Sequence, residues 1–264
     1  HREADGWPLA PLPGALAAAP RARRDGIEPE WSQLPVSYSQ TSAARHAWLD
    51  ESPHAAAELE FWRDTLDGAP GETELPLDRP RGRDSEVTGR SGSSVTSTID
   101  PDTYGAIRTI ATEADATVFM VLHASVALLL RSLAQSSDVI IGTPVSGRGD
   151  ADLDDLVGMF VNTLALRTVV DKDLPFADLV AHVRDTDLNA FDNADMPFDR
   201  LVTELNPARS GNVHPYFQVS MALEDRSAIR LDFAGLSATA SRVDTGRTTF
   251  DLQFTFTEVR GATG

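Results

Sequence analysis

The sequence predicts an α/β protein, because segments with the pattern of strands and segments with the pattern of helices share one chain of 264 residues. Stretches 55–66 and 175–191 repeat apolar residues at helical spacing. By contrast, 139–141 and 161–170 have the character of buried strands. The length suits one large domain or two small ones, with ample material for a core.

Composition excludes several classes of function. The net charge of -17 argues against nucleic acid or an anionic membrane as a partner. The chain has no Cys, which excludes disulfides, thiolate zinc sites and a Cys nucleophile, and we expect a cytoplasmic location. The longest apolar run, 118–130, is shorter than the roughly 20 residues that span a bilayer, and we expect no signal peptide. We find no pattern of metal ligands.

In the first part of the chain, the prolines at 8, 11, 13 and 20 should break the earliest helix, displace it or shorten it to 14–24, since proline in a helix interior costs about 3 kcal/mol or more. An amphipathic helix follows at 55–66 and ends at Gly68. Residues 71–92, rich in Pro, Gly, Arg and acids, indicate an exposed connection, and 94–99 alternates as a strand.

Two helices come next. Asp100 and Pro101 begin one that reaches residue 114, and Thr117 caps another that runs to about residue 132. The second is apolar nearly all round and is therefore expected to be buried. His123 within it is interpreted as a hydrogen-bonded core residue.

The stretch 138–167 organises the rest of the chain. A buried strand at 139–141 leads into a Gly/Pro turn at 142–147, and a second strand occupies 161–170. Pro144 and the glycines would weaken a strand in the middle of a sheet, so this turn should bring backbone close to a ligand channel or a neighbouring domain.

The last third continues the pattern. A helix is expected at 175–191, and Asn193 and Asp195 are candidate N-caps of a helix at 197–205. Strands are expected from about residue 219, at 231–233 and at 248–257.

Four motifs together resemble the condensation domains of nonribosomal peptide synthetases. They are 142–148 with 157–167 (GTPVSGR and VGMFVNTLALR), 193–198 (NADMPF), 206–219, and the spacing of His1, Asp5 and Gly6. The resemblance implies a chloramphenicol-acetyltransferase-like mixed sheet with flanking helices. A complete condensation domain has two such halves in a V, and this chain corresponds mainly to the C-terminal half.

The resemblance implies that the chain divides into two regions. Residues 1–37 would be the end of the N-terminal subdomain, with the active-site motif and a linker. Residues 38–264 would be the C-terminal subdomain, truncated at its end. Reaction would take place where the two halves meet.

His1 corresponds to the second His of the family's active-site motif and is the candidate catalytic residue. An imidazole with a pKa near 6.5 can accept the proton that an amine loses as it attacks a thioester. The family is argued to use this His either as that base or as a positioning group, and the sequence leaves both open. Asp5 and Gly6 are the motif's structural residues, and Arg148 is the candidate ion-pair partner of Asp5. Candidates for the substrate tunnel are Trp7, Asn162, Asn193 and Asp195.

The implied reaction joins a carrier-bound acyl or peptidyl thioester to a carrier-bound aminoacyl amine. No intrinsic cofactor or metal is implied, since substrates arrive on the phosphopantetheine arms of upstream and downstream carrier proteins. The missing N-terminal half and an adjacent adenylation domain are further implied partners.

The chain also departs from the family pattern. It has prolines at 8, 11 and 13, and it has Gln40-Thr41 and Ala44-Arg45 where the family has an Asp-aromatic pair and Trp-Gln. A degenerate relative that recruits carriers or partners without catalysis therefore stays open, as does a freestanding acetyltransferase-like enzyme.

Overall fold

A computed structural model describes residues 11–31, 33–78, 90–207, 213–225, 232–233, 236–237, 243 and 245–259. The helices of this part of the chain are α1 (Pro11–Arg24), α2 (Tyr38–Glu51), α3 (Pro53–Leu66), α4 (Pro101–Glu113), α5 (Val118–Ala134), α6 (Phe176–Asp192) and α7 (Phe198–Leu205), with the 3-10 turn η2 (Ala151–Leu153). The strands are β1 (Arg90–Ser91), β2 (Asp138–Val145), β3 (Asn162–Val169), β4 (Val219–Asp225), β5 (Asp232–Phe233), β6 (Leu236–Ser237), β7 (Arg247–Thr248) and β8 (Leu252–Glu258).

The main sheet is mixed, with the strand order β3-β2-β4-β8. β2 and β3 are antiparallel over their full length, from Asp138 opposite Val169 to Val145 opposite Asn162. β4 runs parallel to both β2 and β8. Two short ladders, β1 with β7 and β5 with β6, complete the pairing of the described residues. The expected α/β fold with a mixed sheet and flanking helices is confirmed.

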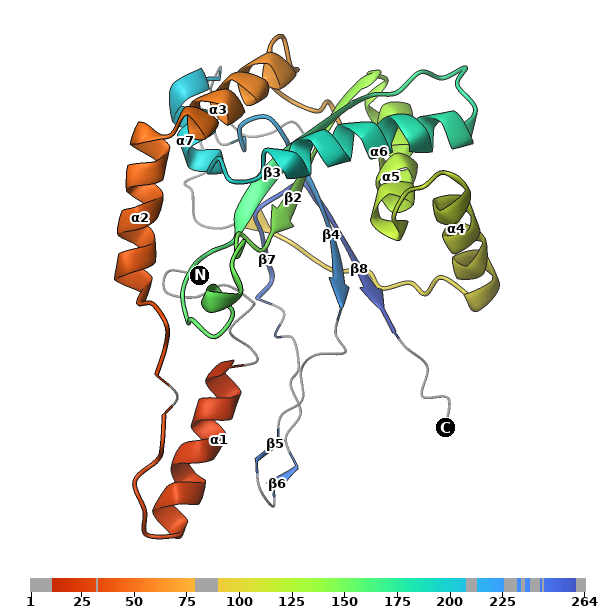
Figure 1. The fold of residues 1–264 in the computed structure, drawn as a ribbon. Helices are drawn as coiled ribbons and strands as arrows, with labels where there is room; N and C mark the ends of the chain where they lie inside the picture. The colour runs from red at the N-terminus through yellow and green to blue at the C-terminus, as the bar shows by residue number, and fades with distance from the viewer. Residues whose placement is uncertain are drawn as a thin grey trace.

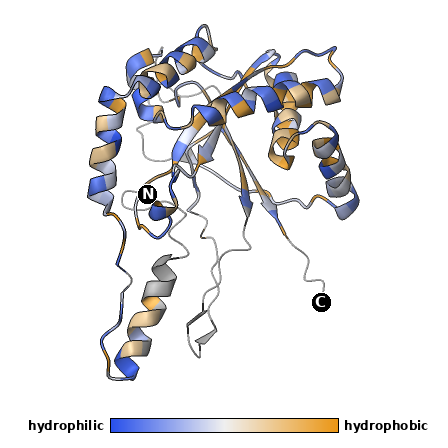
Figure 2. Cartoon of the chain, viewed as in Figure 1, coloured by the Kyte–Doolittle hydropathy of each residue, from blue (hydrophilic) through white to orange (hydrophobic). Residues whose placement is uncertain are grey.

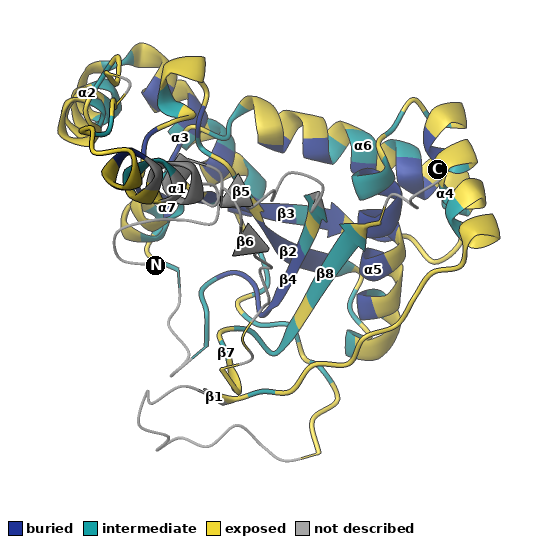
Figure 3. Ribbon diagram, turned by 90° about the horizontal axis from the view of Figure 1, so that it is seen from below, coloured by how far each residue is buried: buried dark blue, intermediate teal, exposed yellow. Residues whose placement is uncertain are grey.

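Helices cover both faces of this sheet. Val139 and Ile141 join a core cluster with α5 and α6, whereas Ile140 joins a second cluster with α3 and α7, as alternation along a strand requires. Figure 1 accordingly shows α4, α5 and α6 gathered on one side of the molecule and α2, α3 and α7 on the other. β2, β3 and the first part of β4 are largely buried, whereas β8 is mostly of intermediate exposure (Figure 3).

The prediction of a turn at 142–147 was wrong for its first part, because β2 continues through Gly142 and Pro144 to Val145. Gly142 is needed there because the Phe217 ring lies against it: a Cβ on Gly142 would be only 2.0 Å from Phe217 Cε2. Pro144 is tolerated because β2 pairs with β4 only at Gly142, so the proline lies beyond that ladder.

Gly142→Ala is therefore expected to destabilise the protein by about 1 to 3 kcal/mol, the usual cost of overpacking a core. Gly105→Ala in α4 is a matched control, since its Cβ would enter open space and alanine favours a helix interior over glycine by about 0.5 to 1 kcal/mol. Thermal melting of the two variants checks this. A Gly142→Ala protein that melts at or above the wild-type temperature would contradict the packing described above.

Most long helices follow the sequence pattern. α3, α4 and α6 match their expected ranges closely, and Asp100 and Thr117 cap α4 and α5 as predicted. α5 is not buried all round, however. Leu128, Leu129 and Leu133 are 38%, 45% and 39% exposed, because the sheet, α4 and α6 pack against the rest of the helix and leave this face open.

Other local predictions were wrong. α1 begins at Pro11, so it is not shortened to 14–24, and it continues through Pro20. Pro11 and Pro13 are tolerated because the first N–H groups of a helix have no intrahelical partner. Residues 94–99 form no strand and are exposed, with Val95 95% exposed. The expected strand at 248–257 is divided between the end of β7 and β8.

α2 was not predicted. None of its 14 residues, all of which the structure describes, is buried, so it lacks the apolar stripe of an ordinary surface helix. Hydrophobic and hydrophilic residues are mixed along it (Figure 2). Its N-terminus does carry a local signal, a capping box in which Ser37 and Gln40 exchange hydrogen bonds.

His123 is a core residue, as predicted. Its Nδ1 lies 2.9 and 3.1 Å from the two carboxylate oxygens of Asp187, which joins α5 to α6, and both side chains are fully buried. His123 Nε2 has no hydrogen-bond partner among the described residues, so the ring is satisfied on one side only.

Among the described helices, none is by itself long and apolar enough to cross a membrane. α4 and α5 reach that threshold only as a pair bent by 104° at their junction.

Candidate functional site

The residues predicted for the site fall into two groups. His1, Asp5, Gly6 and Trp7 lie outside the described residues, and their roles stay predictions. Arg148, Asn162, Asn193 and Asp195 are described.

Arg148 lies just beyond the end of β2, and its side chain reaches the interior, with 9% exposed. Its Nη1 donates to the carbonyl oxygens of Leu153 and Leu156, the latter at 3.0 Å, and thereby fixes the turn that contains η2. The guanidinium carbon is 4.1 Å from the centre of the Phe160 ring, a cation–π contact.

The close backbone approach predicted for the Gly/Pro segment occurs at Gly147. This residue has φ +60°, and a Cβ on it would lie 1.9 Å from the carbonyl oxygen of Phe160. The approached group is therefore the protein's own connection between η2 and β3. Only glycine suits such a position, because it combines positive φ with no room for a side chain.

The first turn of α2 packs on the same connection. The Tyr38 hydroxyl donates to the carbonyl oxygen of Met159 at 3.0 Å, and the Tyr38 ring meets Phe160 edge to face, with centroids 5.3 Å apart. A Cβ on Gly158 would be 2.4 Å from Tyr38 Cδ2, so glycine again permits the contact.

Asn162, one of the tunnel candidates, makes structural contacts, and its role in a tunnel stays a prediction. It is 7% exposed, and its amide is fully engaged. Nδ2 donates to the carbonyl oxygens of Ala194 and Met196 at 2.9 and 2.7 Å. Oδ1 accepts from the N–H of Thr163 at 2.8 Å and of Phe198 at 3.0 Å. Asn162 thus caps α7 from a distant strand.

The prediction that Asn193 and Asp195 cap α7 was therefore wrong. The N-cap position is occupied by Pro197, which has no side-chain donor or acceptor to offer. Asn193 lies at the C-cap of α6, where its Nδ2 donates to the carbonyl oxygen of Asn189 at 2.8 Å. Asp195 is exposed on the loop between the two helices.

Side chains from three elements hold this 193–197 loop. Trp62 Nε1 of α3 donates to the carbonyl oxygen of residue 193 at 2.8 Å, and Arg45 Nη2 of α2 donates to that of residue 195 at 2.6 Å. Because Asn162 binds the carbonyls of residues 194 and 196, four successive carbonyls of the loop are held by side-chain donors. Such a loop is rigid, and it presents Asp195 on a fixed backbone.

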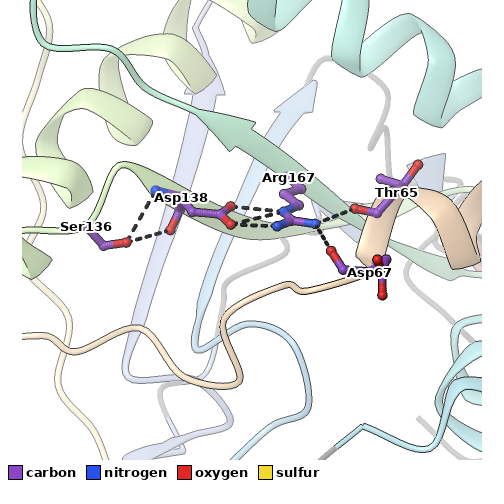
Figure 4. Close-up of polar contacts among 5 residues, drawn as sticks. All are labelled: Thr65, Asp67, Ser136, Asp138 and Arg167. Carbon is purple, nitrogen blue, oxygen red and sulfur yellow. Dashed lines mark hydrogen bonds and ion pairs between the residues drawn. The ribbon is translucent and has the colours of Figure 1, made fainter.

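A second anchor is Arg167, near the other end of β3 (Figure 4). Its guanidinium pairs with the Asp138 carboxylate, with Nη2 to Oδ2 at 2.7 Å, and Nη1 donates to the carbonyl oxygens of Thr65 and Asp67 at 2.9 and 2.6 Å. Hydrogen bonding to Asp138 raises the pKa of Arg167. These bonds tie β2, β3 and the end of α3 together, beside a groove of about 330 Å³ between α3, β3 and α6.

An aromatic cluster follows α7. His214 stacks on Phe198 with centroids 5.5 Å apart and contacts Phe217 and Phe250 at 4.4 and 5.2 Å. Burial lowers the pKa of His214. Gln218, nearby, donates from Nε2 to the carbonyl oxygen of His214 at 2.9 Å, which fixes the entry into β4.

Sequence reasoning missed Arg45 and Trp62 as residues that hold the 193–197 loop. Trp62 is fully buried in the core, and its indole N–H also binds the loop. No three His, Asp or Glu side chains of the described part of the chain are placed to hold a metal ion.

The family model for the condensation domain matches residues 1–263. The chain is 37% identical over 268 residues to a dimodular nonribosomal peptide synthase of Bacillus subtilis, covering 100% of the chain and 11% of that relative. It is 38% identical over 262 residues to an isonitrile lipopeptide synthase of Mycobacterium tuberculosis, covering 98% of the chain and 10% of that relative. The chain thus spans about a tenth of the length of these relatives.

Solved structures agree. The X-domain in its complex with OxyB from teicoplanin biosynthesis matches with a TM-score of 0.88 and 26% identity, over 98% of this chain and 57% of that one. The first condensation domain of the CDA synthetase matches with a TM-score of 0.67 and 23% identity, over 89% and 49% of the two chains, and this likeness concerns the fold alone. From the sequence match over nearly its whole length and the shared fold, we conclude that the chain belongs to the condensation-domain family of nonribosomal peptide synthetases.

Proposed function

We propose that this chain is part of a catalytic condensation domain, which transfers an acyl or peptidyl group from one carrier thioester to the amine of a second carrier-bound aminoacyl group. The observation that carries the proposal is the family match, which begins at residue 1 and therefore includes the spacing of His1, Asp5 and Gly6. In this reaction a C–N bond forms, the C–S bond breaks, the donor arm leaves as thiolate and the amine loses a proton.

His1 is proposed to act on that amine, either by accepting its proton or by holding the tetrahedral intermediate, a contribution of roughly 10² to 10⁴ in rate. The phosphopantetheine arms are substrates, and the proposal requires no intrinsic cofactor or metal. Positioning of the two tethered reactants supplies much of the remaining rate, since effective molarities reach about 10⁵ to 10⁸ M.

The described residues support this proposal by their rigidity. Arg148 fixes the connection between β2 and β3, and the proposal assigns Asp5 as its further ion-pair partner. The 193–197 loop, held at four carbonyls, offers Asn193 and Asp195 as a preorganised wall for a substrate. Fixed dipoles and charges are more effective than mobile ones, because they need no reorganisation during the reaction.

The proposed partners are the upstream and downstream carrier proteins, the N-terminal half of the condensation domain and an adjacent adenylation domain. The division at residue 37 between two subdomains and the cytoplasmic location stay predictions.

A second candidate is recruitment of a partner without condensation. The X-domain match favours it, because it has a higher TM-score (0.88) than the condensation domain of the CDA synthetase (0.67), and that X-domain was solved in complex with OxyB.

An assay with two loaded carriers separates the two candidates. The intact protein that contains this chain is mixed with a donor carrier and an acceptor carrier, and both are followed by intact-protein mass spectrometry. Condensation predicts that the acyl mass moves to the acceptor carrier. If the acyl group stays on its donor while either carrier or an accessory enzyme binds, recruitment is the better account.

A further inference from the structure

β3 lies at an edge of the main sheet, since in the described part of the chain it pairs with β2 alone. Val170, which directly follows β3, donates its N–H across the ladder to the carbonyl oxygen of Ser137 at 2.7 Å. Alternate residues of an antiparallel strand bond the same neighbour, so the even-numbered residues of β3 face β2 and the odd-numbered ones present their N–H and C=O outward. The N–H of Thr163 agrees with this phase, because it donates to Asn162 Oδ1 at 2.8 Å.

The groove of about 330 Å³ between α3, β3 and α6 runs along this outward edge. The β3 residues that line it are Ala165, Arg167 and Val169, all of them odd-numbered residues whose backbone faces away from β2. In the described part of the chain, no residue is hydrogen-bonded to the outward N–H or C=O of Arg167 or Val169. The groove closes at Ala165, which is fully buried, and opens at Val169, which is 56% exposed. An incoming chain therefore meets the backbone at the end that holds Arg167 and Val169.

The sequence of β3 does not protect this edge. Edge strands of native proteins usually carry a free charge, a proline or a bulge that prevents further pairing. β3 has neither Pro nor Lys, and its register with β2 is unbroken. Its single charge, Arg167, is directed toward α3, where the Asp138 carboxylate and two backbone carbonyls hold it (Figure 4). The edge is thus able to accept another strand.

We propose that the outward edge of β3 is a docking site for an extended peptide, which adds a fifth strand to the four-stranded main sheet by bonding to Arg167 and Val169. Strand addition of this kind draws its affinity from main-chain hydrogen bonds and its selectivity from side chains on the two faces. The inference goes beyond the proposed reaction, and it holds whether or not the domain condenses.

The occupant is an extended segment of the same polypeptide outside these 264 residues. Two relatives contain the corresponding stretch within chains about ten times as long. A segment tethered to the domain by a short flexible linker has an effective concentration in the mM range, so it occupies the edge ahead of a free partner.

The walls of the groove select the side chains of this segment. Val169 lies on the same face of β3 as Arg167, toward α3, and it lines that wall together with Phe61. The α6 wall is polar and includes Thr186 and His182. No carboxylate lines the groove, although the chain carries 40 acidic residues. The site therefore fits a strand that alternates apolar residues, facing α3, with uncharged polar or acidic residues, facing α6.

Hydrogen–deuterium exchange resolved to single amides, measured on the intact protein that contains this chain, tests for the added strand. The amides of Leu166 and Thr168 face β2 and should be slow in any case. The proposal predicts that the amides of Arg167 and Val169 are slow as well, by at least about 10-fold relative to an unbonded amide. If both exchange as unbonded amides do, no strand is added and the proposal is overturned.

Val169→Pro removes an outward N–H and spares the ladder to β2, since proline is tolerated at an edge position whose N–H faces away from the sheet. In the intact protein it should speed exchange at Arg167 at least about 10-fold while Leu166 stays slow. Val169→Thr is the matched control, because threonine keeps the N–H and nearly the same shape, and Arg167 should then exchange as in the wild type. Equal effects of the two variants would show that main-chain pairing is not responsible, which contradicts the proposal.

A photo-crosslink identifies the occupant. Thr186, on the α6 wall, is replaced by p-benzoylphenylalanine, and the same replacement of Asp102, exposed on α4, is the control. After irradiation of the intact protein, mass spectrometry should find position 186, and not position 102, joined to a segment of the same polypeptide outside this chain that alternates apolar and polar residues. Val169→Pro should remove this cross-link. A cross-link to a second copy of this chain or to another protein, or no cross-link at position 186, would overturn the proposal.

Discussion

Asn162→Ala is expected to lower the free energy of unfolding by about 3 to 5 kcal/mol. The side-chain amide of Asn162 makes four hydrogen bonds in a buried position, each worth about 1 kcal/mol net. Removing the amide also leaves its buried partners unpaired. The variant removes the cap of α7 and two of the four bonds that hold the 193–197 loop. Urea unfolding followed by tryptophan fluorescence measures the effect, since buried Trp62 binds the same loop.

Asn189→Ala is the matched control for this variant. Asn189 is exposed on α6, so its truncation should change stability by no more than about 0.5 kcal/mol. If Asn162→Ala proves as mild as this control, Asn162 does not organise the loop.

Asp187→Leu should cost about 3 to 5 kcal/mol, because it leaves His123 buried without its partner. The companion variant His123→Leu should be similarly destabilised. When both are changed to leucine together, no polar group remains unpaired, and much of the stability should return. The double-mutant cycle from urea unfolding gives the coupling. Additive losses in the double variant would contradict the pairing of these two residues.

The sequence predicted those helices and strands that bury one of their faces in the core. α3, α4 and α6 carry apolar residues at helical spacing, and β3 was placed to within a residue or two, because burial imposes these patterns. α2 was missed because its contacts are few and specific, such as Tyr38 with the carbonyl of Met159. Only the Ser37 and Gln40 capping box marked it.

The errors arose where distant contacts override local chemistry. Gly142 and Pro144 favour a turn locally, yet the Phe217 ring and the pairing with β3 keep them in a strand. Asn193 and Asp195 are good capping residues beside α7, yet Asn162, 36 residues before Phe198, supplies the cap. A reading of local sequence has no means of detecting such a bond.

For the motif residues too, burial could be expected from the sequence, whereas the specific hydrogen-bond partners could not. Arg148 was expected to reach the interior from a Gly/Pro turn, and it is buried just beyond the end of β2. Its two carbonyl partners on the connection to β3 were not anticipated. Arg45 was noted in the sequence only as a departure from the family pattern, and only the folded chain brings it to the 193–197 loop.

The central claim is that this chain belongs to a working condensation site with His1 as its acting group, and one measurement tests it most directly. Transfer between two loaded carriers is timed for the intact wild-type protein and for His1→Ala, and both proteins are melted under the same conditions. The account predicts transfer by the wild type, a loss of at least about 100-fold in His1→Ala and an unchanged melting temperature. Transfer at a near-normal rate by His1→Ala, or no transfer by the wild type, would contradict it.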